Sequence, residues 1–84
     1  MNDKVLVEIY VPAVGKKFDV RIPLSTKMYK VTKMVSSALS DLSDEKYRAK
    51  EDSILCDANT GIIYNVNMEV KELGIENGSK LMLI

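Results

Sequence analysis

The chain has 84 residues, 46% of them hydrophobic and 29% charged, and its twelve basic residues balance its twelve acidic ones. This length suffices for one hydrophobic core, so we expect a single domain over residues 1–84. A neutral net charge argues against binding nucleic acid through its phosphates. No apolar run approaches the ~18 residues of a membrane span, and the first residues lack the apolar region of a signal peptide. These features predict a cytoplasmic protein without direct membrane insertion.

Residues 5–11 and 17–24 alternate between apolar and polar side chains, which is typical of half-buried β-strands. The linker 12–16 is short and contains proline and glycine, so the two strands are predicted to form a hairpin. Pro23 has no N–H to donate to a neighbouring strand, which predicts that the second strand lies at a sheet edge or that its pairing ends at this residue. The residues expected to face the core are Val5, Val7, Ile9, Val11, Phe18, Val20, Ile22 and Leu24.

The apolar spacing then changes to three and four residues, which predicts one amphipathic helix over 27–42 with Ser25 or Thr26 as its N-cap. The residues expected on its apolar face are Met28, Val31, Val35, Ala38 or Leu39, and Leu42. The residues expected on its polar face are Ser36, Ser37, Ser40 and Asp41. In segment 43–52, seven of the ten residues are charged, which predicts a solvated connection. Whether this connection contains a helical turn stays open.

The second half of the chain contains shorter elements. Apolar segments 54–56 and 62–64 flank the turn residues 57–61, which predicts a second hairpin. Residues 70–74 are typical of a single helical turn that ends at a glycine. An Asn-Gly pair then precedes the apolar strand 80–84. This order predicts an α+β fold of the β-grasp type, in which one mixed sheet of four to five strands packs on one helix and the last strand lies centrally beside the first.

The whole chain resembles ubiquitin in the order and spacing of these elements. The letters GIENGSKLMLI at 74–84 are similar to the ending of small bacterial ubiquitin-like proteins of the YukD/EsaB type, which accompany type VII secretion systems. The resemblance implies a non-conjugated protein that acts by protein–protein contact as a cytoplasmic accessory or regulator of secretion. Its partner would be a cytoplasmic domain of the secretion machine, at the inner face of the membrane. A ubiquitin-like or Ras-binding-type adaptor in another pathway stays open as the alternative.

The sequence gives little support to catalysis. It contains no histidine, so the commonest general base is missing and no Ser-His or Cys-His pair can form. A single cysteine cannot form an internal disulfide, and Cys56 is expected to be a small buried hydrophobe. We therefore expect no enzyme activity, no catalytic, cofactor or metal site, and no small-molecule substrate. Conjugation by ubiquitin-type enzymes requires a terminal Gly-Gly, so we expect that Ile84 is not activated.

An exposed apolar patch on the sheet is the first candidate protein-binding site. Alternation in the last strand directs Met82 and Ile84 to the face opposite the core, which is a common recognition surface in ubiquitin-like proteins. By alternation and proximity, Leu6 and Leu55 are expected to extend this patch. Scattered surface hydrophobes, which need no special role, are the alternative interpretation.

A basic stripe on the helix is the second candidate site. Lys27, Lys30 and Lys33 fall within an arc of ~120° at the start of the predicted helix. Positive charge at a helix N-terminus opposes the macrodipole, so these lysines are expected to serve an acidic partner. A solvated face without a selected role is the competing interpretation.

Overall fold

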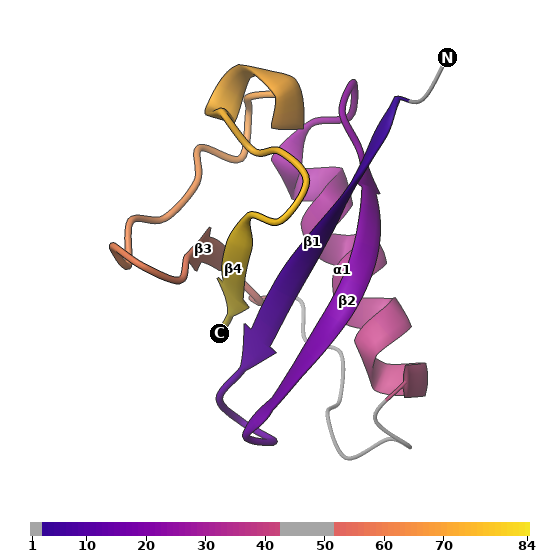
Figure 1. The fold of residues 1–84 in the computed structure, drawn as a ribbon, viewed down its shortest axis with the longest axis vertical. Coiled ribbons are helices and arrows are strands. Elements are labelled where there is room, and N and C mark those ends of the chain that lie inside the picture. Colours follow the sequence, from indigo (N-terminus) through magenta and orange to yellow (C-terminus); the bar gives the residue numbers. More distant parts are fainter. Residues whose placement is uncertain (1–2, 43–51) are drawn as a thin grey trace.

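The computed structural model describes residues 3–42 and 52–84, which form a four-stranded sheet, one α-helix and one 3-10 helix (Figure 1). The elements in chain order are β1 (Lys4–Val11), β2 (Lys16–Pro23), α1 (Met28–Leu42), β3 (Leu55–Asp57), η1 (Val70–Leu73) and β4 (Lys80–Leu83). Apart from its last residue, the charged segment predicted at 43–52 lies outside the described residues. Neither helix in the described part of the chain is long and apolar enough to cross a membrane.

β1 and β2 form the predicted antiparallel hairpin, with Lys4 opposite Pro23 and Val11 opposite Lys16. The chain reverses through a turn in which Gly15 has a φ of 64°, a conformation that glycine adopts without steric cost. The odd-numbered residues of β1 are buried and its even-numbered residues are not, as the alternation predicts. The hydrophobic pattern therefore selects the face of β1 that meets the core.

β4 lies in the centre of the sheet, whose strand order is β2-β1-β4-β3. It runs parallel to β1, with Ile9 opposite Leu81, and antiparallel to β3, with Leu83 opposite Leu55. An isolated bridge pairs Cys56 with Ile63 and adds the second half of the predicted hairpin beside β3. The prediction of a mixed sheet with the last strand beside the first is therefore confirmed, as is the edge position of β2.

The turn before β4 explains why Asn-Gly stands at positions 77 and 78. The side-chain oxygen of Asn77 accepts a hydrogen bond from the N–H of Leu6 at 2.8 Å. The N–H of Gly78 donates to the carbonyl of Leu6 at 2.9 Å, and Gly78 has a φ of 88°. Asn77 and Gly78 together saturate the backbone of Leu6 and so align β4 with β1.

α1 crosses one face of the sheet and closes a single core among the described residues (Figure 1). Its buried side chains are Met28, Val31, Thr32, Val35, Ser36 and Leu39. Two predictions on this helix were wrong: Leu42 is 61% exposed, and Ser36, expected on the polar face, is only 2% exposed. Hydrophobic spacing predicts the direction in which a helical side chain points, but not whether another element lies there to cover it. Ser36 is small, and the neighbouring buried hydroxyl of Thr32 is satisfied because it donates to the carbonyl of Met28 at 2.8 Å.

α1 begins without the predicted side-chain cap. The carbonyl of Lys27 accepts the first helical hydrogen bond, from the N–H of Val31 at 3.2 Å, so Lys27 takes the N-cap position. The prediction of Ser25 or Thr26 as N-cap was wrong by one or two residues. The local sequence suggested that a serine or threonine hydroxyl would accept hydrogen bonds from the first N–H groups of α1, but the acceptors of these N–H groups come from elsewhere in the chain.

Those acceptors are backbone carbonyls of the segment before η1. The N–H groups of Met28 and Tyr29 donate to the carbonyls of Met68 and Val66, at 2.9 and 3.1 Å. The first N–H groups of a helix have no partner within the helix, so this segment satisfies two of them. A contact about forty residues distant in sequence thus replaces a local cap.

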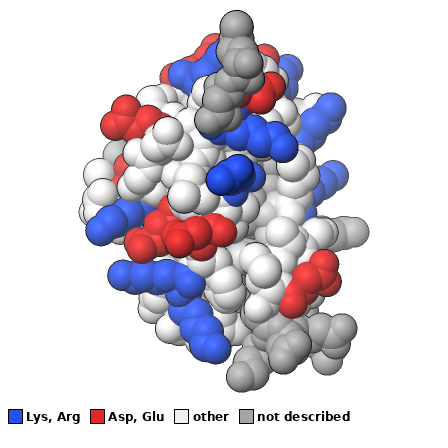
Figure 2. All heavy atoms as spheres, turned by 45° about the vertical axis from the view of Figure 1, so that its right-hand side comes forward, with Lys and Arg blue, Asp and Glu red and all other residues white. Residues whose placement is uncertain are grey.

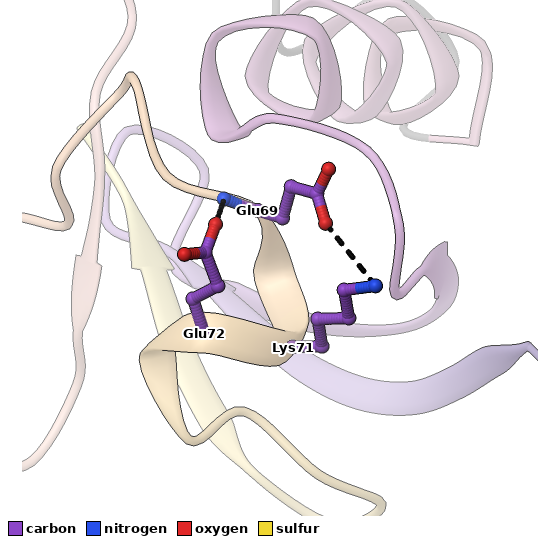
Figure 3. Close-up of polar contacts among 3 residues, drawn as sticks. All are labelled: Glu69, Lys71 and Glu72. Carbon is purple, nitrogen blue, oxygen red and sulfur yellow. Dashed lines mark hydrogen bonds and ion pairs between the residues drawn. The ribbon is translucent and has the colours of Figure 1, made fainter.

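η1 has a polar arrangement of its own at the start of the turn (Figure 3). The carboxylate of Glu72 accepts a hydrogen bond from the N–H of Glu69 at 3.0 Å, and Lys71 lies 3.4 Å from the carboxylate of Glu69. Gly74, with a φ of 72°, ends the turn as predicted. The N–H of Val70 donates to the carbonyl of Thr26 at 3.1 Å and fixes η1 beside the start of α1.

Candidate protein-binding face

The sheet face opposite α1 has no described helix over it (Figure 1). Directly opposed residues on neighbouring strands share a face, so the pairing shows which side chains meet there. Tyr10 lies opposite Met82, and Met82 lies opposite Cys56. The bridge from Cys56 to Ile63 extends this row beyond β3. One apolar row therefore crosses the outer face from β1 to the segment beside β3.

A second apolar pair lies next to this row. Ile54 and Ile84 each donate an N–H to the carbonyl of the other, at 2.8 and 2.9 Å, which continues the register of β3 and β4. Ile54 is 37% exposed, Ile84 47% and Ile63 57%. Tyr10 and Met82 are half-buried. We call the set Tyr10, Ile54, Ile63, Met82 and Ile84 the outer apolar patch.

The predicted inclusion of Leu55 in the exposed patch was wrong. Leu55 is 3% exposed and lies opposite Leu83, on the face that packs against α1. Ile54 takes the outward position that was assigned to Leu55. Three apolar residues in succession, 54–56, show no alternation, so only the pairing with β4 decides which of them point outward.

The other three predicted patch residues lie on the outer face but do not form one group. Met82 and Ile84 lie together within the outer apolar patch. Leu6 is 43% exposed and lies opposite Arg21. The charged pair of Glu8 and Lys80 separates Leu6 from the row of Met82. Sequence reasoning also missed Tyr10 and Ile63, although the alternation of 5–11 already directed Tyr10 outward.

The lysines of the predicted basic stripe are all exposed. Lys27 lies directly before α1, and Lys30 and Lys33 lie in its first two turns. The first turn of α1 contains no acidic residue and the last turn no basic residue, so both ends lack the charges that the macrodipole favours. On the face drawn in Figure 2, basic side chains form several separate groups with acidic groups between them.

Cys56 is buried, as predicted, with 1% of its surface exposed. Its thiol donates a weak hydrogen bond to the carbonyl of Met82 across 3.6 Å. Burial, and to a smaller degree the charge of Asp57, raises the pKa of the Cys56 thiol. Because the thiolate is the nucleophilic form, this cysteine is protonated and unreactive at neutral pH.

No family model and no curated protein matches the sequence. Solved structures do match. The ubiquitin-like domain of the Mycobacterium tuberculosis type VII secretion protein EccD1 has a TM-score of 0.78 and 15% identity, over 100% of this chain and 99% of that one. The ubiquitin-like domain of Plasmodium falciparum Dsk2 has a TM-score of 0.71 and 18% identity, over 95% of both chains.

A longer chain in the MycP5-free ESX-5 inner membrane complex matches with a TM-score of 0.80 and 15% identity. This match covers 99% of the present chain but only 21% of that one, so the present chain spans about a fifth of its length. Identities this low establish the fold alone. Together with the sheet order, the central last strand and the single helix, these matches show that the chain has the ubiquitin-like β-grasp fold.

Proposed function

We propose that this protein is a bacterial ubiquitin-like interaction module of a type VII secretion system, of the YukD/EsaB type. It acts without conjugation and without catalysis, by binding a protein partner through the outer apolar patch. The partner is a cytoplasmic domain of a secretion component, which brings a cytoplasmic protein to the inner face of the membrane. The chain 1–84 is a single domain in this proposal.

The outer apolar patch is the observation that carries this proposal. Its residues come from two adjacent rows, and three of them are isoleucines at least 37% exposed. The core lies on the other face of the sheet, so these side chains are not needed to fill it. Contiguous exposed apolar surface on a soluble domain typically marks a protein interface. The absence of histidine and the burial of Cys56 support a role in recognition rather than in catalysis.

The assignment to secretion is supported by the similarity to the EccD1 domain, which covers almost all of both chains. The second candidate, an adaptor in another pathway, is supported by the similarity to the Dsk2 domain, whose TM-score of 0.71 is close to the 0.78 of the EccD1 domain. Both candidates use a ubiquitin-like domain as a binding module. They differ in the partner, so a binding assay with purified cytoplasmic domains of the secretion apparatus separates them.

Replacing Met82 or Ile63 with Asp tests the outer apolar patch. A carboxylate in the centre of the interface would be buried without a partner, so we expect a loss of at least about 2 kcal/mol of binding free energy for each variant. Leu6→Asp is the matched control for Ile63→Asp: Leu6 is 43% exposed, against 57% for Ile63, and lies on the same face but outside the patch. Calorimetric titration with a cytoplasmic secretion domain measures all three affinities.

Thermal unfolding of the variants serves as the folding control. Ile63 is 57% exposed, so Ile63→Asp is expected to keep the thermal midpoint of the parent protein. Unchanged affinity for both Met82→Asp and Ile63→Asp would reject the outer apolar patch as the interface. An equal loss for Leu6→Asp would show that charge on any part of the sheet interferes, and would reject the assigned location.

A further inference from the structure

The turn before β4 contains a chemically reactive pair of residues. Asn77-Gly78 is the one Asn-Gly pair in the sequence, and the other asparagines precede Asp, Thr, Val or Met. The backbone nitrogen of the residue after an asparagine can attack the side-chain amide carbon, which forms a cyclic succinimide and releases ammonia. A glycine leaves this approach open because it has no side chain. Asparagine therefore counts among the thermolabile residues of proteins.

Water then opens the succinimide at one of its carbonyl carbons. Opening at one carbonyl gives aspartate, and opening at the other gives isoaspartate, in which the main chain runs through the former side chain. The net reaction consumes water and the side-chain amide, and it yields a carboxyl group and ammonia. No enzyme, metal or oxidant is required, so at a given pH and temperature the local structure sets the rate.

In the folded protein, the backbone of Leu6 holds both reacting groups. The side-chain oxygen of Asn77 accepts a hydrogen bond from the N–H of Leu6 at 2.8 Å. The N–H of Gly78 donates to the carbonyl of Leu6 at 2.9 Å. The attack requires the Gly78 nitrogen to give up this proton, and it requires the Asn77 side chain to turn its amide carbon toward that nitrogen. Each change breaks a hydrogen bond to β1.

Further hydrogen bonds restrain the backbone on each side of the pair. The N–H of Glu76 donates to Oγ of Ser79, and the N–H of Ser79 donates to the carbonyl of Glu76, both at 3.0 Å. The carbonyl of Ser79 accepts from the N–H of Glu8, also at 3.0 Å. Asn77 and Gly78 themselves are exposed, so water reaches them. Restraint of the backbone, rather than exclusion of water, therefore protects this pair.

We propose that Asn77 is a deamidation site, which the fold keeps unreacted as long as the turn stays bound to β1. The reaction proceeds when the turn separates from Leu6, and its product then records that separation as a permanent covalent change. This inference rests on the chemistry of the turn, so it does not depend on the function proposed above.

The two products have different consequences for the sheet. Aspartate keeps the length of the main chain and an oxygen that accepts from Leu6, so β4 stays aligned with β1. The cavities beside Asn77 are lined by the cationic side chains of Lys4, Arg21 and Lys80 and by the anionic side chains of Glu8 and Asp19. A new carboxylate thus meets a small excess of positive charge. Isoaspartate adds an atom to the main chain before Gly78, which displaces the N–H of Gly78 from the carbonyl of Leu6.

The first experiment compares the reaction in the full chain with that in a peptide. The probe is acetyl-Ile-Glu-Asn-Gly-Ser-Lys-amide, which has the sequence of residues 75–80 without the fold. Both are incubated at mildly alkaline pH and physiological temperature, and mass spectrometry of the digested chain follows Asn77. Because the turn must open before the attack, we expect Asn77 to react at least about tenfold more slowly in the folded protein than in the peptide. Equal rates would overturn the proposal.

Unfolding of the parent protein tests whether the fold is the source of the protection. In urea sufficient to unfold the chain, we expect the rate at Asn77 to rise to that of the peptide in the same urea. Slow reaction in the unfolded chain would contradict the proposal, because the protection would then come from the local sequence. Asn59, Asn65 and Asn67 are internal references that should react more slowly than Asn77 in urea, since the side chain that follows each one obstructs the attack.

Ser79→Ala tests the turn itself without changing the Asn-Gly pair. It removes the hydroxyl oxygen that accepts from Glu76, so the turn should open more often, and we expect Asn77 to react about fivefold faster in the folded protein. The same substitution in the peptide is the matched control and should leave the rate unchanged. An unchanged rate in the variant protein, or an equal rise in the peptide, would show that the turn does not control the reaction.

Hydrogen exchange tests the consequence for the sheet. The aspartyl and isoaspartyl forms are produced in urea, refolded and separated by chromatography, and Asn77→Asp made by mutation identifies the aspartyl form. We expect the amides of Leu6 and Gly78 to exchange in the aspartyl form as slowly as in the parent protein, and at least about tenfold faster in the isoaspartyl form. Equal exchange in the two products would reject the role assigned to Leu6 in holding the turn.

Discussion

Ile54 and Leu55 are adjacent aliphatic residues with opposite roles. Leu55 lies opposite Leu83 within the core, whereas Ile54 pairs with Ile84 on the outer face. A shift of one residue in the register of β3 would exchange the two roles, because successive side chains of a strand point to opposite faces. The location of the outer apolar patch therefore depends on this register.

The register predicts unequal effects of truncating these two residues. Leu55→Ala leaves a cavity beside Leu83, and we expect a loss of about 2–5 kcal/mol of unfolding free energy. Ile54→Ala removes a side chain that is 37% exposed, so we expect a loss of about 1 kcal/mol or less. Urea unfolding followed by circular dichroism measures both. Equal losses, or a larger loss for Ile54→Ala, would contradict the register.

At the scale of the element, α1 combines poorly placed charges with an unusual start. Its first turn carries Lys30 and no acidic residue. Carbonyls of Val66 and Met68 accept its first N–H groups in place of a side-chain cap. The helix is therefore stabilised by its packing and by this distant backbone segment rather than by local end effects.

Reversing the charge of Lys30 should stabilise the protein. A carboxylate in the first turn interacts favourably with the helix macrodipole, so Lys30→Glu is expected to raise the unfolding free energy by about 0.3–1 kcal/mol at low salt. Lys33→Glu is the matched control, because it lies one turn farther along and the effect falls off within the first turn. Urea unfolding at low and high salt measures both variants. The interpretation would fail if Lys33→Glu stabilised the protein as much.

At the scale of the whole molecule, the two faces of the sheet have different roles. α1 packs on one face and closes the core, whereas the outer apolar patch lies on the other face, over β1, β3 and β4. Both faces use the same strands, so the register that buries Leu55 and Leu83 also places Ile54 and Ile84 outward.

The stability of the whole fold should fall at alkaline pH. Burial, and then Asp57, raises the pKa of both Cys56 and Tyr64, from ordinary values of 9.0 and 10.0. An acid whose pKa is raised by folding loses its proton more readily in the unfolded state, so unfolding is favoured as pH rises. Full stability is expected below pH 9.0, with a progressive loss above it.

Cys56→Ala separates the two groups in this experiment. Without the thiol, the loss of stability should begin only near the ordinary tyrosine value of 10.0. Chemical unfolding at a series of pH values, for the parent protein and this variant, gives both curves. Stability that stays constant well above pH 10.0 in the parent protein would contradict the burial of these groups.

The local elements were predictable because each depends on a short stretch of sequence. Alternation in 5–11 identified both the strand and its buried face, and Gly74 marked the end of η1. The helix period identified α1 within one residue at its start. The N-cap at Lys27 was not predictable. The first N–H groups of α1 donate to the carbonyls of Val66 and Met68, and no local pattern connects that segment with the start of the helix.

The sequence by itself determined the main strands and the helix, the buried face of β1 and the central position of β4, because apolar periodicity and the completely apolar run 81–84 leave few alternatives. Only the tertiary structure decided that Ile54 and not Leu55 faces outward. The run 54–56 has no polar residue to distinguish its faces, so its orientation follows from hydrogen bonding to β4.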